Sequence, residues 1–166
     1  MTSSKNVALL IVLALVAFLG IAAARQTAGD SGNSIAFPKD YRGWHHAKTM
    51  VIEAGHPLAS PFEGLHNIYV NDKGLEAHKK AAPFPDGSIL VFDLFETAKS
   101  DSAITTDKRK FVAVMVKDAA KYKETGGWGF ERFDARFRPT HTDSKGCFQC
   151  HVSGDTTDFV LSRYVE

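Results

Sequence analysis

Five residues near the C-terminus constrain this chain more than any other feature. They read Cys147-Phe148-Gln149-Cys150-His151 and include the only two cysteines of the sequence. Two thiols at this spacing can add to the two vinyl groups of one haem, and the histidine that follows then lies under the iron as an axial ligand. The motif therefore predicts one covalently attached haem c, bound through Cys147 and Cys150, with His151 as the metal ligand.

Three other uses of the cysteine pair compete with haem attachment. A zinc site needs two more ligands, and the sequence has no second C-x-x-C and no H-x3-H. A thioredoxin-like redox pair is the stronger rival because C-x-x-C lowers a thiol pKa. Such a pair belongs on a βαβ unit, however, whereas this one follows a run of predicted strands. A structural disulfide is the third alternative. The haem interpretation stands ahead of all three if the protein is exported.

The N-terminus has the pattern of a secretory signal peptide. Lys5 precedes an apolar run over residues 7–23, Ala22-Ala23-Ala24 offers a small-residue cleavage site, and Arg25 opens a polar stretch. The apolar run approaches the ~18 residues that span a bilayer, so an uncleaved anchor is the alternative. Cleavage after residue 24 is the favoured interpretation, and in a bacterium it places the protein in the periplasm.

Residues 25–166 suit a single domain. Residues 25–36 are small and polar and read as a flexible leader, which leaves residues 37–166 for the folded haem domain. Of the 20 basic residues in the chain, Lys5 is the one that cleavage removes, so 19 basic and 19 acidic residues remain. This balance argues against nucleic acid as a partner, which normally requires a clustered basic surface.

Strand and turn signals predict a mainly β domain with a few short helices. The expected strands are residues 46–53, 65–70, 88–96, 110–117 and 128–133, and the expected helices are 72–80 and 119–123, capped by Asp72 and Asp118. Residues 99–107 are expected to be a polar loop. Short turns between consecutive strands imply an antiparallel sheet. Asp93, Glu96 and Glu131 are expected to point into solvent.

The order of several short motifs resembles cytochrome P-460 and its relative cytochrome c′-β. The likeness runs from about Phe37 to Tyr164 and ends in the C-x-x-C-H motif. Its other parts, in chain order, are Tyr41-Arg42-x-Trp44, Ile68-Tyr69-Val70, Pro85-Asp86-Gly87, Val116-Lys117-Asp118 and Gly127-Trp128-x-Phe130. Each part is weak alone, but the order together with the haem motif is specific.

The resemblance separates two kinds of chemistry. The enzymatic branch resembles a hydroxylamine oxidase, with a lysine cross-linked to the haem and a glutamate over the distal face. The matching positions are Phe92 and Ala113 in this sequence. Phenylalanine cannot form the cross-link, and alanine cannot act as the base that hydroxylamine oxidation needs. The chain therefore resembles the cytochrome c′-β branch and is not expected to be an enzyme.

For that branch the resemblance implies an open, apolar haem pocket. Phe62 and Phe92 match the aromatic residues that cap the iron, which leaves His151 as the only axial ligand. Without the resemblance, both phenylalanines would be read as core residues. Strand alternation places Ala113 on the same face as Met115. Arg163 is expected to pair with a haem propionate or to lie near the axial histidine. The expected function is capture, sensing or detoxification of NO in the periplasm, with CO as a second ligand.

Two other functions stay open. A six-coordinate electron carrier would use Met115, Met50 or one of the other histidines as the second axial ligand, namely His45, His46, His56, His66, His78 or His141. An enzyme that oxidises hydroxylamine or a related nitrogen compound ranks third. The resemblance also implies a homodimer, and the periplasmic setting allows a redox partner.

Overall fold

The computed structural model describes residues 34–166. The predicted signal peptide (1–24) and most of the predicted leader (25–36) fall outside the described residues. Within residues 34–166, no helix is both long enough and apolar enough to cross a membrane.

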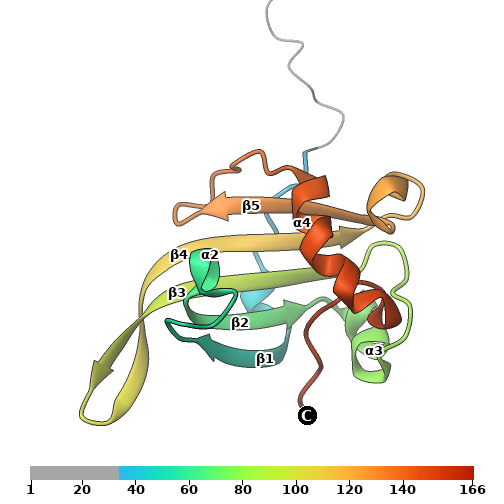
Figure 1. Ribbon diagram of the computed structural model, residues 1–166. Helices are drawn as coiled ribbons and strands as arrows, with labels where there is room; N and C mark the ends of the chain where they lie inside the picture. The colour runs from blue at the N-terminus through green and yellow to red at the C-terminus, as the bar shows by residue number, and fades with distance from the viewer. Residues whose placement is uncertain (1–33) are drawn as a thin grey trace, which may run out of the picture. The chain divides into compact units, whose positions relative to one another are not determined.

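The described chain is built on one antiparallel sheet of five strands that follow each other in sequence order (Figure 1). The strands are β1 (His45–Ile52), β2 (Gly64–Val70), β3 (Ile89–Ser100), β4 (Ala103–Lys117) and β5 (Trp128–Asp134). All four pairings between neighbours are antiparallel. The predicted fold class, a mainly β domain with an antiparallel sheet and short helices, is confirmed.

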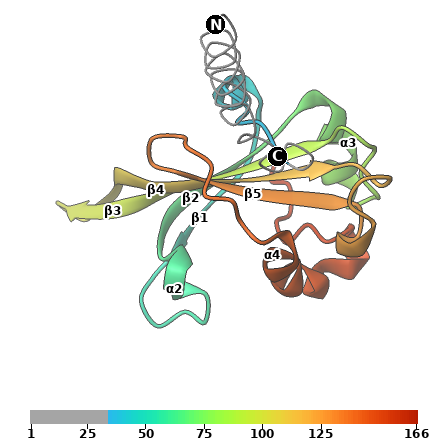
Figure 2. The same ribbon diagram turned by 90° about the horizontal axis from the view of Figure 1, so that it is seen from above.

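Short helices lie around this sheet. They are η1 (Tyr41–Gly43), α2 (Ala59–Phe62), α3 (Asp72–Lys80), η2 (Lys123–Thr125), α4 (Ser144–His151) and η3 (Val152–Thr157). Figure 2 shows α2 and α4 on the same side of the sheet, toward opposite ends of its strands. This side carries the cysteine motif and is called the α4 face below.

Strand alternation divides the core into two clusters. On β4, Val112 and Val114 belong to a cluster with Tyr41 on the face away from α4. Met115 packs instead with Phe130 in the cluster that includes the cysteine motif. Successive side chains of β4 therefore point to opposite faces of the sheet, which puts Ala113 and Met115 on the same face, as predicted.

The predicted polar loop over residues 99–107 is wrong. The β3 and β4 ladder continues to the pair Ser100 and Ala103, and only Asp101 and Ser102 form the turn, both with positive φ (51° and 62°). The result is a two-stranded arm that extends beyond the rest of the sheet (Figure 1). The arm is rich in threonine, and β-branched residues favour the extended backbone even where both faces are exposed.

Helix α3 begins as predicted, but its N-cap is Asn71 rather than Asp72. The Asn71 Oδ1 accepts hydrogen bonds from the backbone N–H groups of Gly74 (3.1 Å) and Ile89 (3.0 Å). One side chain thus satisfies the helix terminus and joins it to the start of β3. The helix predicted over residues 119–123 is a turn followed by η2, with Asp118 Oδ1 accepting from the N–H of Lys121 at 2.9 Å.

Asp93 and Glu131 are buried, so their predicted exposure is wrong, whereas Glu96 is exposed. Asp93 is 0% exposed and accepts hydrogen bonds from Tyr41 Oη (2.7 Å) and Arg109 Nε (2.7 Å). Alternation correctly assigns Asp93 to the face away from α4. It does not reveal that the segment containing Tyr41 covers that face.

Candidate haem-binding site

The cysteine motif lies in α4, where no helix was predicted. Asp143 caps the helix, because its carboxylate accepts from the N–H groups of Lys145 (3.0 Å) and Gly146 (3.2 Å). Residues three apart on a helix share a face, so the helical turn places Cys147 and Cys150 side by side. Both thiols are free, with Cys147 partly buried and Cys150 exposed.

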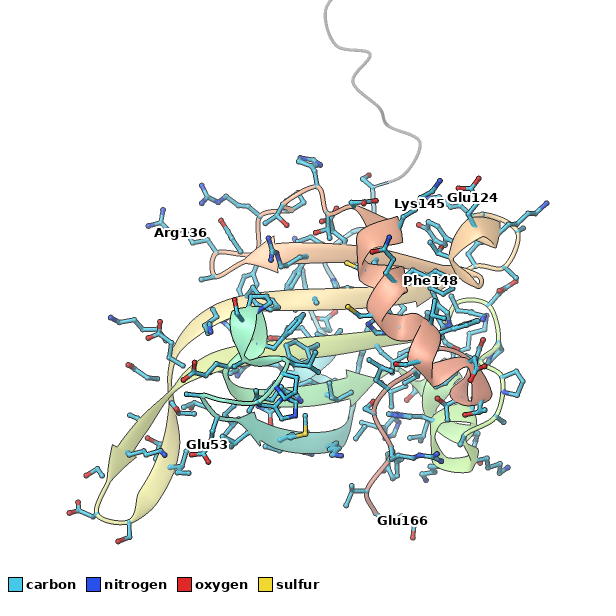
Figure 3. The ribbon with its side chains drawn as sticks, in the orientation of Figure 1. Glu53, Glu124, Arg136, Lys145, Phe148 and Glu166 are labelled. Carbon is cyan, nitrogen blue, oxygen red and sulfur yellow. The ribbon has the colours of Figure 1, made fainter. Side chains whose placement is uncertain are left out.

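Contacts with other segments of the chain also hold helix α4 in place. Lys145 Nζ lies 2.6 Å from Glu124 Oε2 of η2, and Figure 3 labels this pair beside the start of α4. The Phe148 ring packs on the Phe159 ring with their centroids 5.0 Å apart. Burial raises the pKa of the Cys147 thiol, so the free thiol stays protonated.

His151 is oriented by a backbone carbonyl. Its Nδ1–H donates to the Phe159 carbonyl oxygen at 2.8 Å, and its ring lies 5.0 Å from the Phe130 ring. With the proton on Nδ1, the other ring nitrogen keeps a free lone pair and can bind a metal. Burial lowers the pKa of His151, which favours the neutral, metal-binding form.

The predicted distal residues come together at the other end of the α4 face. The rings of Phe62 and Phe92 lie 5.9 Å apart and are nearly perpendicular, at 82°. Phe92 is the strand partner of Ala113, so the two positions that matched the enzymatic lysine and glutamate are adjacent. Phe111 completes the group, with its ring 6.0 Å from Phe62 and 5.9 Å from Phe92.

Two polar residues also lie at this end: His66, one of the histidines considered as a sixth ligand, and Arg132, which was not assigned to the site from the sequence. His66 stacks on Phe92 at 4.4 Å between centroids and is 4% exposed. The pKa of His66 is lowered to about 4, mainly by burial and to a lesser degree by the charge of Lys48. The guanidinium of Arg132 lies 5.4 Å from the Phe111 ring centroid. The alternation of β2 and β5 was the signal that could have placed both residues on the α4 face.

The remaining predicted residues lie elsewhere. Arg163 is exposed in the closing segment, so its pairing with a propionate stays a prediction. Met115 is on the α4 face but is the strand partner of Phe130, close to His151 rather than to Phe62.

The arrangement fits a covalently bound haem. Two free thiols share one side of α4, His151 presents a free nitrogen, and Phe92, Ala113 and Met115 form apolar surface that is only partly buried. Such surface is what the apolar body of a porphyrin would cover.

Comparison with known proteins agrees with this geometry. Residues 38–162 match the model of the family described as Cytochrome P460. No curated protein matches the chain. The chain therefore belongs to the cytochrome P460 family and is a haem cytochrome.

Proposed function

We propose that this protein is a periplasmic mono-haem cytochrome of the cytochrome c′-β type, which binds NO and CO. Cys147 and Cys150 would hold the haem covalently, and His151 would be the one axial ligand. When bound, the haem supplies an iron centre to which a neutral diatomic gas can bind. The residues of the chain then decide which ligands reach that centre.

The observation that carries this proposal is the order of side chains along β4. At one end, the Phe111 ring lies 6.0 Å from the ring of Phe62. At the other end, Met115 is the strand partner of Phe130, whose ring lies 5.0 Å from His151. Four residues of strand separate the two ends by about 13 Å. The residues proposed as the aromatic cap and the histidine proposed as the axial ligand thus lie toward opposite ends of one apolar stretch of sheet.

The middle of that stretch is formed by Phe92 and Ala113, which are strand partners. Its polar neighbours are His66, which stacks on Phe92, and Arg132, which is the strand partner of Ala113. Phe92 and Ala113 themselves supply no base and no hydrogen-bond donor. A neutral gas such as NO or CO needs neither group in order to bind. Hydroxylamine oxidation does need a base, because protons must leave with the electrons. The pair therefore favours gas binding over the enzymatic alternative.

The electron-carrier alternative now depends on His66 rather than on Met115. A sixth ligand would have to come from a part of the α4 face away from His151, and Met115 lies at the His151 end of β4. His66 lies at the opposite end, stacked on Phe92 at 4.4 Å. Its pKa of about 4 means that a neutral imidazole is present at pH 7. A bis-histidine electron carrier is therefore the second candidate function.

The first experiment is the anaerobic optical spectrum of the reduced protein, before and after addition of CO and then NO. Broad high-spin bands that shift with both gases would support the proposal. Sharp low-spin bands unmoved by CO would refute it. In that case His66→Phe tests the second candidate, because removal of a ligating imidazole should convert the spectrum to the high-spin, CO-sensitive form.

The enzymatic alternative has its own test. Phe92→Lys together with Ala113→Glu restores the two groups that the resemblance assigns to the hydroxylamine-oxidising branch. Because the two positions are strand partners, both new side chains would project from the same point of the α4 face. A double variant with neither a cross-linked haem nor oxidase activity would show that these positions do not correspond to the enzymatic ones.

Export and dimerisation belong to the same proposal. The mass of the protein from the periplasmic fraction should equal residues 25–166 plus one haem, whereas retention of residues 1–24 would indicate an uncleaved anchor. The sheet has β1 and β5 as its edge strands, and an edge strand can pair with a second copy of the chain. On β5 the outer backbone groups of Arg132 are already bonded to Thr140 and Thr142, which leaves β1 as the more open edge. Sedimentation of the haem-bound protein should give twice the monomer mass, and a monomer would refute the dimer.

A further inference from the structure

We propose that the buried ion pair between Lys117 and Asp158 positions the axial histidine. The pair holds the backbone turn whose carbonyl, at Phe159, accepts the hydrogen bond from His151. Through that carbonyl it tunes the electron donation of the imidazole. This inference rests on the proposed role of His151 as the axial ligand.

Asp158 is held by three parts of the fold at once. Its Oδ1 lies 2.7 Å from Lys117 Nζ at the end of β4, and its Oδ2 accepts from the backbone N–H of Phe84 at 2.8 Å. Its own carbonyl accepts from Trp128 Nε1, at the start of β5, at 2.8 Å. The side chains of Lys117 and Asp158 are only 10% and 12% exposed. Little water is therefore available to replace these partners.

The turn that these bonds hold is an unfavourable one. Asp158 (φ 52°, ψ 42°) and Phe159 (φ 65°) are consecutive non-glycine residues in the left-handed region. Such backbone persists only where the surroundings over-determine it. The Phe159 N–H also donates to the Gly154 carbonyl at 2.7 Å. Together these contacts direct the Phe159 carbonyl at His151 Nδ1, 2.8 Å away.

Lys117 is suited to a positioning role. Besides Asp158, its Nζ donates to the Gly126 carbonyl at 3.0 Å and lies 5.0 Å from the centroid of the Trp128 ring. Side chains fit tightly on this side of the turn. The ring of Phe159 lies so close to Gly126 that a Cβ added there would overlap it. A buried ion pair contributes little net stability compared with apolar residues, so geometry is the stronger reason for it.

The expected effect concerns the iron. A hydrogen bond that an axial histidine donates from its second nitrogen raises the basicity of the ligand. If the Phe159 carbonyl moves, this bond weakens and the imidazole donates less charge. The oxidised iron is then stabilised less, so the reduction potential rises.

The test compares reduction potential and the iron–histidine vibration of the reduced protein in haem-bound variants. Lys117→Met and Asp158→Asn should each raise the potential and lower the vibrational frequency. The double variant should shift both no further than the larger single change, because each substitution releases the same turn. Trp128→Phe, which removes one hydrogen bond and keeps a ring, should shift both in the same direction by less.

Asp93→Asn is the matched control. It disrupts the hydrogen bonds that one buried carboxylate accepts from Tyr41 and two arginines on the opposite face of the sheet, so it weakens the fold without touching the turn. If it shifts the potential as much as Asp158→Asn does, general loosening explains the effect and the inference fails. Unchanged potentials in all Lys117, Asp158 and Trp128 variants would also overturn it.

The outcome for the proposed function is read separately, from the unmodified protein. If the unmodified protein lacks a haem bound through His151, the proposed function fails and the inference fails with it. If the unmodified protein is six-coordinate, the gas-binding proposal fails, and the potentials alone still decide the positioning role.

Discussion

Asp93 provides the sharpest test of what stabilises this fold. Its carboxylate is 0% exposed and accepts hydrogen bonds from Tyr41, Arg42 and Arg109. Asp93→Asn keeps the shape but removes the charge that both guanidinium groups face. Removal of one partner from a buried ion pair costs about 3–5 kcal/mol.

The lower end of that range is expected, because the two arginines differ in their access to water. The Arg42 side chain is 57% exposed and can be hydrated, whereas that of Arg109 is 17% exposed and would stay uncompensated. A loss of about 3 kcal/mol corresponds to a fall in Tm of about 10 °C for a domain of this size. Urea unfolding followed by circular dichroism measures the free energy directly.

Glu53→Gln is the control for this measurement. Glu53, which is labelled in Figure 3, also forms an ion pair, at 2.8 Å from Lys99, but both side chains are 64% exposed. Its removal should change stability far less, because water replaces the partner. Equal effects of Asp93→Asn and Glu53→Gln would refute the reasoning. Asp93→Leu combined with Arg109→Met removes the uncompensated charge to which the cost is assigned, so this double variant should recover most of the lost stability. If it does not, the reasoning is also refuted.

Two further predictions concern stability. The pKa of His66 is lowered from 6.5 to about 4, so the unfolded chain binds a proton at a pH where the folded protein does not. Stability should therefore fall from about pH 6.5 to pH 4, by on the order of 3 kcal/mol, and level off below. His66→Phe should remove this part of the pH dependence in urea titrations, whereas the exposed His141→Gln should not. Asn71→Ala should lower the free energy of unfolding by about 1 kcal/mol by circular dichroism, and more than Asp72→Ala, because Asn71 is the N-cap of α3.

Local features of the sequence were enough to predict the sheet. Each strand carries its own alternation or apolar run, and the turn residues between strands are adjacent in sequence. The same alternation predicted that Ala113 and Met115 share a face. It missed the length of the arm, because exposed strands such as residues 103–107 show no burial pattern to detect.

The exposure of charged residues could not be predicted in this way. Alternation assigns Asp93 to a face, but whether that face meets water depends on the segment that includes Tyr41, which is distant in sequence. The same limit applies to His66, which was one of six histidines considered for a sixth ligand. Its contact with Phe92 requires β2 and β3 to be paired in the observed register.

The sequence by itself was enough to predict the chemistry of haem attachment, because Cys147, Cys150 and His151 are neighbours and their spacing requires no knowledge of the fold. Only the tertiary structure decided what surrounds that motif. It brought Phe62 to Phe92, placed Met115 at the His151 end of β4, and aimed the Phe159 carbonyl at His151. These relations join segments far apart in the chain, and they follow from strand register and backbone turns rather than from local sequence.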